Sequence, residues 1–318
     1  MSMILVTGAR GQIGSDLVRT LRERHGAEAV IATDLREPEE QAETSGPYEV
    51  VDIRDRTKLD EVAQRYNVDT IYHLASLLSA RGEQAPDLAW EVNVGGLRNV
   101  LEIARENGLK VFWPSSIAVF GPTTPDNAPQ KTPLEPTTMY GVTKVSGELL
   151  CRYYQLRYGV DVRSLRYPGL ISYGAEPGGG ATDYAVEIFH AALEQGEYTC
   201  FLAADTRLPM MYMPDAVRAT MELMDAPKEQ LSVRTSYNVT ALSFSAEELS
   251  ASIAKRVEGF VTRYKPDFRQ DIAASWPSSV DDASARADWN WLPEYDLSSM
   301  VDDMLVHLRE KLNVSASS

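Results

Sequence analysis

The stretch that decides the fold is Val6-Thr7-Gly8-Ala9-Arg10-Gly11-Gln12-Ile13-Gly14. It follows an apolar run at 3–6 and opens a helical pattern at Ile13. A glycine-rich turn between a strand and a helix lets the backbone approach a pyrophosphate, and the helix N-terminus points unpaired N–H groups at it. A second apolar run, 29–32, leads to Asp34, which lies 20 residues after Gly14, where an acidic side chain hydrogen-bonds an adenosine ribose. This spacing predicts a dinucleotide-binding unit.

Strand and helix patterns alternate through the first half of the chain, which predicts a parallel sheet with helices on both faces. Further strands are expected at 49–51, 70–74, 110–113 and 160–165, and helices at 56–66, 86–107 and 140–158. The expected fold class is therefore α/β, with a Rossmann-type doubly wound parallel sheet.

Beyond Tyr167 the pattern changes to that of a smaller C-terminal α+β substrate lobe. Its expected elements are helices at 183–195, 215–224, 245–258 and 297–312 and a strand at 260–264. Ser245 and Glu248 form a capping-box pattern at the start of one of these helices. We expect an NAD-binding domain at 1–170, a mainly substrate-binding lobe at 171–313 with elements that return to the first domain, and a frayed tail at 314–318.

Composition excludes several classes of function. Of the 318 residues 44% are hydrophobic, which suffices for a large core. The formal net charge of −15 is opposite to what nucleic acid or an anionic membrane surface requires, so neither is an expected partner. No apolar run is long enough for a membrane span, and the first strand leaves no room for a signal peptide, so a cytoplasmic protein is expected. Cys151 and Cys200 belong to no cluster with ligand spacing, and no metal site is expected.

Tyr140 and Lys144 lie four residues apart at the start of an expected helix, so their side chains project from one face. A free tyrosine titrates near ~10, but a nearby ammonium and a cationic nicotinamide ring favour the phenolate, which accepts a proton from a substrate hydroxyl. Ser116 follows an expected strand, at the sheet edge where ligands bind in such folds. A lone Tyr-x-x-x-Lys pair is usually structural, but its coincidence with Ser116 and the glycine turn favours catalysis.

Residues 1–175 resemble the extended short-chain dehydrogenase/reductase superfamily. The motifs that carry the resemblance are, in chain order, Gly8, Gly11 and Gly14, Asp34, Asp52-Ile53, His73-Leu74-Ala75, Asn93, Ser116 and Tyr140/Lys144. The resemblance implies that Tyr140 is the acid/base, that Lys144 lowers its pKa and holds the nicotinamide ribose, and that Ser116 hydrogen-bonds the substrate oxygen. It implies NAD as cofactor, bound by Gly8, Gly11, Gln12, Ile13, Gly14, Asp34, Leu35, Arg36, Asp52, Ile53, Leu74, Ala75, Ser76, Asn93, Tyr140, Lys144 and Tyr167.

Three further stretches, at 77–83, 166–185 and 264–291, extend the resemblance over nearly the whole chain. Together they are similar to the metal-independent L-threonine 3-dehydrogenases. The resemblance implies oxidation of the side-chain alcohol of L-threonine by NAD to 2-amino-3-oxobutanoate with release of NADH, and a homodimer or higher homo-oligomer. The substrate-binding residues that it implies are Ser79, Ser116, Tyr140, Gly179 and Thr182.

Several residues keep a second interpretation. Asp34 favours NAD over NADP, but Arg36 either packs on the adenosine or hydrogen-bonds near it, and its role stays open. Asp52 is an adenine-side contact or a solvated surface charge, and His73 is better interpreted as a satisfied core histidine than as a catalytic group. Ser79 and Thr182 are substrate contacts or ordinary polar loop residues. The three glycines at 178–180 are a candidate mobile lid.

Two other function classes remain. A sugar-nucleotide epimerase or dehydratase that retains NAD uses the same Ser/Tyr/Lys set but also holds a nucleoside diphosphate, for which scattered arginines offer no clear clamp. A non-catalytic NAD(H) sensor is disfavoured, because such sensors typically lose the Tyr/Lys pair, which is intact here.

Overall fold

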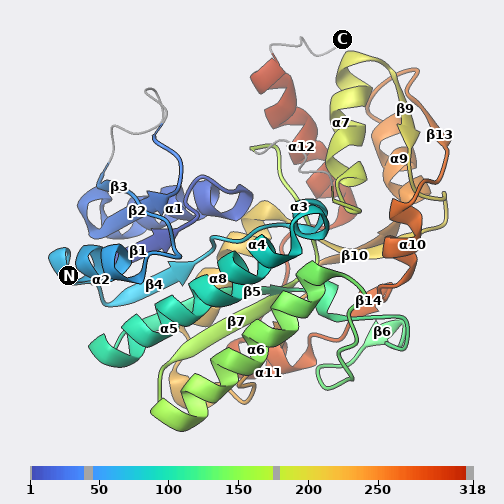
Figure 1. Ribbon diagram of the computed structural model, residues 1–318. Helices are drawn as coiled ribbons and strands as arrows, with labels where there is room; N and C mark the ends of the chain where they lie inside the picture. Colours follow the sequence, from blue (N-terminus) through green and yellow to red (C-terminus); the bar gives the residue numbers. More distant parts are fainter. Residues whose placement is uncertain (1, 39–45, 175–179, 313–318) are drawn as a thin grey trace.

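The computed structural model describes residues 2–38, 46–174 and 180–312. Its centre is a seven-stranded sheet in the order β11-β7-β5-β4-β1-β2-β3, in which every neighbouring pair is parallel. The strands are β1 Ile4–Thr7, β2 Val30–Asp34, β3 Tyr48–Val50, β4 Thr70–His73, β5 Lys110–Ser116, β7 Val162–Tyr167 and β11 Tyr237–Asn238. The predicted Rossmann-type doubly wound sheet is confirmed (Figure 1).

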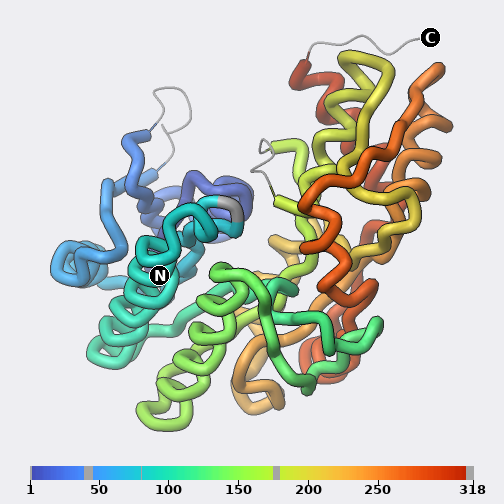
Figure 2. The backbone as a smooth tube through the Cα atoms, turned by 45° about the vertical axis from the view of Figure 1, so that its right-hand side comes forward, coloured from blue at the N-terminus to red at the C-terminus, as the bar shows by residue number. Residues whose placement is uncertain are grey.

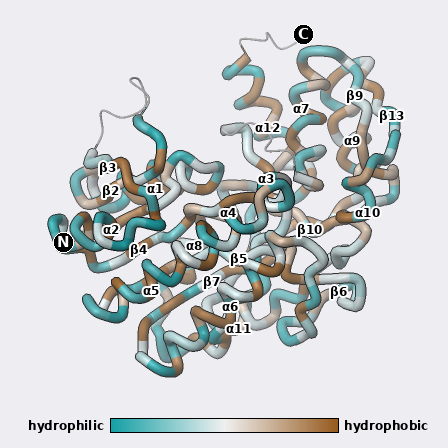
Figure 3. Tube along the Cα trace, viewed as in Figure 1, coloured by the Kyte–Doolittle hydropathy of each residue, from teal (hydrophilic) through white to brown (hydrophobic). Residues whose placement is uncertain are grey.

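Helices cover both faces of this sheet (Figure 1). One face packs against α2 (Arg56–Arg65), α5 (Gly96–Asn107) and α6 (Met139–Tyr158). The other packs against α1 (Gln12–His25), α8 (Met213–Asp225) and α11 (Ala283–Trp289). A strand with helices on both faces buries the side chains of both its faces, so its sequence is a nearly continuous apolar run without polar alternation. β1 is such a strand, and all of its residues are buried. Apolar and polar segments alternate along the covering helices instead, as α5 shows in Figure 3.

The helix expected at 86–107 contains a wider turn. It begins as α4 (Pro86–Trp90), passes through a π-helical turn at Glu91–Gly95 and continues as α5. The expected end is confirmed, because Gly108 follows in the left-handed conformation at φ 69°. Such π turns appear where one side chain needs a position that the regular helix does not give, and here the turn carries the buried Asn93.

The second part of the chain forms the expected smaller α+β lobe, seen in yellow to red in Figure 2. Its apolar centre joins helices and short strands that lie mostly beyond residue 168. The helices are α7 Tyr184–Glu194, α9 Ala246–Ala254, α10 Arg269–Ala274 and α12 Leu297–Leu312. The strands are β8 Gly169–Ile171, β10 Arg207–Tyr212 and β12 Leu242–Ser245 in one sheet, β9 Glu197–Cys200 with β13 Val261–Tyr264, and β6 Asn127–Ala128 with β14 Ser279–Val280. The predicted capping box of Ser245 and Glu248 is present at the start of α9.

Three segments of the later chain, β11, α8 and α11, return to the first sheet. β11 pairs with β7, and α8 packs against α1 beneath the central strands. Trp289 and Trp291 are buried there, in the cluster around α1 and α8 rather than inside the lobe. The expected tail at 314–318 lies outside the described residues, and within those residues no helix is long and apolar enough to cross a membrane.

Candidate active site

Three catalytic candidates meet at the carboxyl edge of the central sheet. Ser116 is the last residue of β5 and lies in register with Tyr167, the last residue of β7. Tyr140 is in the first turn of α6, where the Thr138 hydroxyl caps the helix by accepting the Gly141 N–H at 3.1 Å. The Ser116 side chain lies close enough to Tyr140 to lower the pKa of its phenol. Parallel strands end at the same edge, so this is the edge where ligands bind in doubly wound sheets.

The orientation of the Ser116 hydroxyl follows from a second contact. The Ala118 N–H donates to Ser116 Oγ at 3.2 Å, so one lone pair of the oxygen is occupied by the backbone. The hydroxyl proton stays available for an acceptor such as the Tyr140 oxygen. Burial raises the pKa of Tyr140 to about 12, and the Ser116 hydrogen bond offsets this only in part.

Lys144 lies one helical turn beyond Tyr140 on the same face of α6, as predicted. Its ammonium donates to the Pro114 carbonyl at 2.7 Å and lies 5.3 Å from the centre of the Tyr140 ring. The side chain is only 2% exposed, and this burial lowers the pKa of Lys144 to about 7. Burial raises the pKa of Tyr140 in the chain by itself, and the expected lowering of that pKa by Lys144 together with a nicotinamide ring stays a prediction.

The glycine turn lies beside this edge. Gly8 has φ 69°, and a Cβ there would lie 2.6 Å from the Ala75 nitrogen, in the loop that follows β4. A Cβ at Gly14 would lie 2.2 Å from the Gly8 carbonyl oxygen. The turn therefore requires both glycines, and Gly11 caps α1 without a side-chain hydrogen bond, so the first N–H groups of α1 keep room for an anionic ligand. Gln12 and Ile13 form the start of this helix, and the arrangement fits the pyrophosphate of a dinucleotide.

Asp34 ends β2 and carries the second half of the predicted cofactor site. Its two carboxylate oxygens accept the Arg10 N–H at 3.1 Å and the Arg36 N–H at 3.2 Å. The Arg36 guanidinium pairs with the same carboxylate at 3.2 Å and donates to the Arg10 carbonyl at 2.8 Å. Arg36 therefore links Asp34 to the glycine turn. The sequence left the role of Arg36 open, and the structure gives this side chain a definite contact. The neighbouring Leu35 side chain is 65% exposed.

Other predicted cofactor contacts lie on the next strand ends. Asp52 pairs with Arg54 at 2.6 Å, and the hydrogen bonds from Arg54 lower the pKa of Asp52. Ile53 is buried against Gly96, at the start of α5. Leu74, Ala75 and Ser76 form the half-buried loop after β4.

Asn93 connects that loop to α6. Its side-chain oxygen accepts from the Leu77 N–H at 2.7 Å and the Ser76 hydroxyl at 3.1 Å. Its amide donates to the Leu77 carbonyl at 3.0 Å and the Thr143 hydroxyl at 3.1 Å. All of these contacts are within the protein, so the structure gives Asn93 a positioning role, and direct contact with the cofactor stays a prediction.

The side chains of Tyr167 and His73 lie in the core. The Tyr167 side chain is 3% exposed and hydrogen-bonds Thr220 of α8, while its backbone lies at the edge that holds Ser116, so its contact with the cofactor stays a prediction. His73 is a core histidine, as expected, and its Nδ1 lies 2.7 Å from the Thr7 hydroxyl. It is not fully satisfied, because its Nε2 has no hydrogen-bond partner within the described residues.

The predicted substrate residues come from different elements. Ser79 begins α3 (Ser79–Gln84), a short helix that the sequence analysis missed and that packs against α6. Glu83 of α3 accepts the Met139 N–H at 2.6 Å, which holds α3 over the start of α6. The Thr182 side chain packs beside Gly169 of β8. Gly179, like most of the candidate lid at 178–180, lies outside the described residues, and the substrate roles of these residues remain predictions.

A buried ion pair beneath the site was also missed. Glu148 and Arg166 face each other at 2.8 Å, one on α6 and the other on β7. The sequence did contain one signal for Glu148. It lies four residues after Lys144, just as Lys144 lies four residues after Tyr140, so all three are on one face of the helix.

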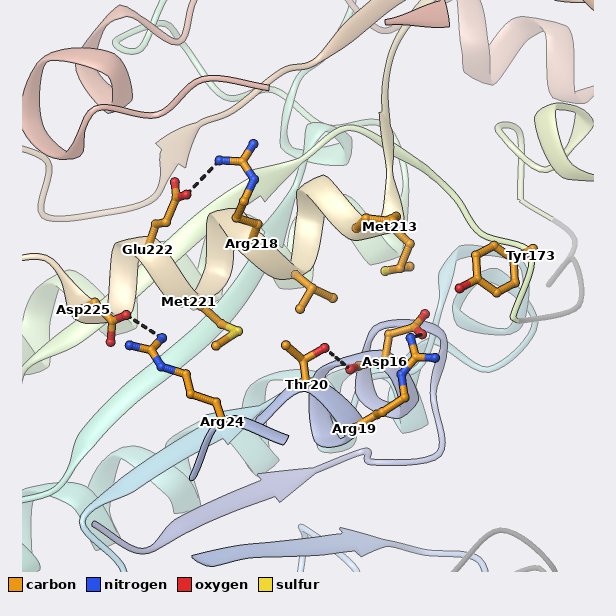
Figure 4. Close-up of a pocket in the computed structure, with 12 residues that line it drawn as sticks. Asp16, Arg19, Thr20, Arg24, Tyr173, Met213, Arg218, Met221, Glu222 and Asp225 are labelled. Carbon is orange, nitrogen blue, oxygen red and sulfur yellow. Dashed lines mark hydrogen bonds and ion pairs between the residues drawn. The ribbon is translucent and has the colours of Figure 1, made fainter. Parts of the chain in front are cut away.

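A separate cavity of about 360 Å³ lies between α1 and α8 (Figure 4). Its apolar wall includes Met213 and Met221, and the Arg24–Asp225 ion pair at 2.6 Å closes one end. None of the predicted site residues lines it, so it is distinct from the Ser116–Tyr140–Lys144 edge.

The model of the NAD-dependent epimerase/dehydratase family matches residues 4–240. An uncharacterized epimerase/dehydratase from Staphylococcus haemolyticus is 49% identical over 314 residues, which cover 98% of this chain and 99% of that protein. The crystal structure of L-threonine dehydrogenase from Phytophthora infestans superposes with a TM-score of 0.94 at 54% identity, covering 98% of this chain and 100% of that one. A monomeric L-threonine 3-dehydrogenase from a metagenome has a TM-score of 0.93 at 50% identity, covering 97% and 99%. The chain is therefore an enzyme of the NAD-dependent epimerase/dehydratase family, within the extended short-chain dehydrogenases/reductases, and its cofactor is NAD.

Proposed function

We propose that this enzyme oxidises the side-chain alcohol of L-threonine with NAD, giving 2-amino-3-oxobutanoate and NADH. The observation that supports the reaction type is the meeting of three side chains: Ser116 acts on the Tyr140 phenol, and the Lys144 ammonium lies beside the tyrosine ring. The substrate is inferred from the similarity to solved structures described as L-threonine dehydrogenases, which match nearly the whole length of this chain.

In the proposed reaction the carbinol C–H bond breaks with its electron pair while the hydroxyl proton leaves for Tyr140, so a carbonyl forms. NAD, when bound, accepts the hydride. Tyr140 Oη takes the proton as the phenolate, the form that the Lys144 ammonium and a bound, positively charged nicotinamide ring would favour. Ser116 holds the substrate oxygen by a hydrogen bond that persists as the carbonyl develops. Lys144 supplies positive charge beside the Tyr140 ring and a donor for the nicotinamide ribose. Its ammonium is oriented by the Pro114 carbonyl.

The decisive experiment compares L-threonine, L-serine and UDP-galactose as substrates while NADH is followed by absorbance. We expect stoichiometric NADH with L-threonine and much less with L-serine. An epimerase that retains its cofactor would instead convert UDP-galactose to UDP-glucose with no net NADH. That result, with no activity on L-threonine, would overturn the proposed function.

Cofactor selectivity is expected to depend on Asp34. The 2′-phosphate of NADP would meet the carboxylate with like charge, at a cost of about 1–3 kcal/mol, or roughly ten- to a hundredfold in catalytic efficiency. Changing Asp34→Ala removes both the repulsion of NADP and the ribose hydrogen bond to NAD. The preference for NAD over NADP should therefore become smaller, chiefly because NAD binds more weakly. Steady-state kinetics with both cofactors measures the change, and Glu37→Ala, at a neighbouring exposed carboxylate, is the control. Equal efficiency of the unchanged enzyme with both cofactors would contradict this role of Asp34.

Activity is expected to survive a strong chelator. Tyr140 is the proton acceptor and NAD the hydride acceptor, so the proposed chemistry assigns no step to a metal ion. Within residues 2–38, 46–174 and 180–312, no group of three or more His, Cys, Asp or Glu side chains is placed to hold one. Turnover measured before and after incubation with EDTA should agree, and a loss that zinc restores would refute the metal-independent mechanism.

A homodimer or higher oligomer remains part of this proposal. α6 exposes three large side chains on its outer face, Leu149, Tyr153 and Leu156, at 57%, 52% and 68%. A second copy of the chain would remove this apolar surface from water.

A further inference from the structure

A buried charge network lies directly beneath the proposed catalytic residues. Glu148 of α6 is 1% exposed and Arg166 of β7 is 4% exposed. Arg166 Nε and Nη2 donate to the two Glu148 carboxylate oxygens, each at 2.8 Å, which is the bidentate geometry that gives the strongest ion pairs. An isolated charge at such depth is strongly disfavoured, so the removal of either side chain alone is expected to destabilise the fold.

The network is anchored to the strand that carries Ser116. The hydroxyl of Ser115 donates to Glu148 at 2.7 Å, and the next residue, Ser116, acts on Tyr140 of the same helix. The carbonyl of Pro114, the residue before, accepts the Lys144 ammonium. One carboxylate thus joins the end of β5 to the helix that supplies Tyr140 and Lys144.

The remaining donors of Arg166 fix the other side of the network. Its Nη1 donates to the Asn238 side-chain oxygen at 3.0 Å and to the Gln130 carbonyl at 3.2 Å. Asn238 in turn donates to the carbonyls of Ala128 and Asp281 at 3.1 and 3.2 Å. Arg166 is therefore held by contacts from β11 and from the chain around β6, and it cannot move away from Glu148 without breaking them.

The electrostatic consequence concerns Lys144. The titratable groups that act on its ammonium are Cys151 and Glu148 on its own helix and His73 on β4, and the Tyr140 ring lies beside it. Burial lowers the pKa of Lys144, while Cys151 and Glu148 raise it. Burial also raises the pKa of the Cys151 thiol and lowers the pKa of His73 to about 3, so both are neutral near pH 7. Glu148 is then the anion that opposes the loss of the Lys144 charge.

We propose that Glu148, held by Arg166 and Ser115, is a positioning residue that keeps Lys144 charged and in place against Tyr140 and Ser116. The inference rests on the catalytic roles proposed above. Glu148 touches neither substrate nor cofactor in this scheme and acts through Lys144. The sign of its effect is definite, because removing a neighbouring negative charge disfavours an ammonium and lowers its pKa.

The test is Glu148→Gln, which keeps the size and one acceptor oxygen but removes the charge. With lysine labelled with ¹³C at Cε, NMR titration follows Lys144 directly, and we expect its pKa to fall by about one unit. Turnover of L-threonine at pH 7 should fall by at least about tenfold, with a smaller change in KM. Glu102→Gln is the matched control, since it breaks an Arg–carboxylate pair on α5, with Arg105 at 2.7 Å, and should leave the Lys144 titration unchanged.

Glu148→Gln leaves Arg166 without its anion and can fail to fold. The double change Glu148→Gln/Arg166→Gln removes both charges, and its fold is checked by circular dichroism. Glu148 acts on the charge of Lys144 and Arg166 is not among the groups that do, so the pKa of Lys144 should fall in the double variant too. A folded variant whose Lys144 titrates as in the unchanged enzyme overturns the inference. The NMR readout needs no substrate, so an enzyme that fails to oxidise L-threonine refutes the proposed function while the titration still decides the role of Glu148.

Discussion

Changing Tyr140→Phe is expected to lower the turnover of L-threonine by at least about a hundredfold, because general acid–base assistance is typically worth ~10²–10⁴ in rate. The change keeps the ring against Lys144 and removes only the hydroxyl that Ser116 orients. NAD affinity should change little, since the glycine turn, Asp34 and Lys144 supply most of the proposed cofactor contacts. Turnover is measured by NADH formation, and NAD binding by calorimetry.

Tyr158→Phe is the matched control, because Tyr158 is the last residue of the same helix, is 44% exposed and lies far along the helix from the catalytic turn. It should leave turnover within about twofold, as surface changes usually do. Near-normal activity of Tyr140→Phe, with an unchanged circular dichroism spectrum, would mean that another group accepts the substrate proton, and the proposed mechanism would have to be abandoned.

Changing Gly14→Ala is expected to weaken NAD binding by at least about a hundredfold, or roughly 3 kcal/mol. The new Cβ would lie 2.2 Å from the Gly8 carbonyl oxygen and 2.9 Å from the Ala9 Cα, and both are backbone atoms that no rotamer change moves. The turn itself must therefore open, which displaces the N–H groups at the start of α1 from the pyrophosphate. Calorimetric titration with NAD measures the loss.

Gly95→Ala is the control for this change. Gly95 has helical angles, φ −62° and ψ −47°, and a Cβ there meets nothing within 4 Å. Its NAD affinity should match that of the unchanged enzyme. If Gly14→Ala binds NAD as tightly as Gly95→Ala does, the pyrophosphate does not lie on this turn.

Local signals predicted the first half of the chain well. The alternation of apolar strands with amphipathic helices, and the glycine turn between β1 and α1, depend on neighbours a few residues apart, so a single sequence contains them. The i,i+4 spacing of Tyr140 and Lys144 is equally local, and the structure places both on one helix face. The end of α5 was predictable because Gly108 adopts a positive φ at little cost.

Contacts between distant segments escaped the sequence analysis. Glu148 and Arg166 are 18 residues apart on different elements, and Arg166 and Asn238 are 72 apart, so no periodicity predicts that they meet. The π turn at Asn93 exists because one amide bridges two separate segments, the loop after β4 and α6.

The sequence alone therefore determined the parallel, doubly wound character of the sheet, the place of the glycine turn and the identity of the Ser/Tyr/Lys candidates. Only the tertiary structure decided that the Tyr167 ring packs in the core, that Arg36 braces Asp34, and that a buried carboxylate at Glu148 lies beneath Lys144. Periodicity records which face of an element is buried. Desolvation and ion pairing depend on what the rest of the chain brings to that face, and this fixes the protonation of the catalytic groups.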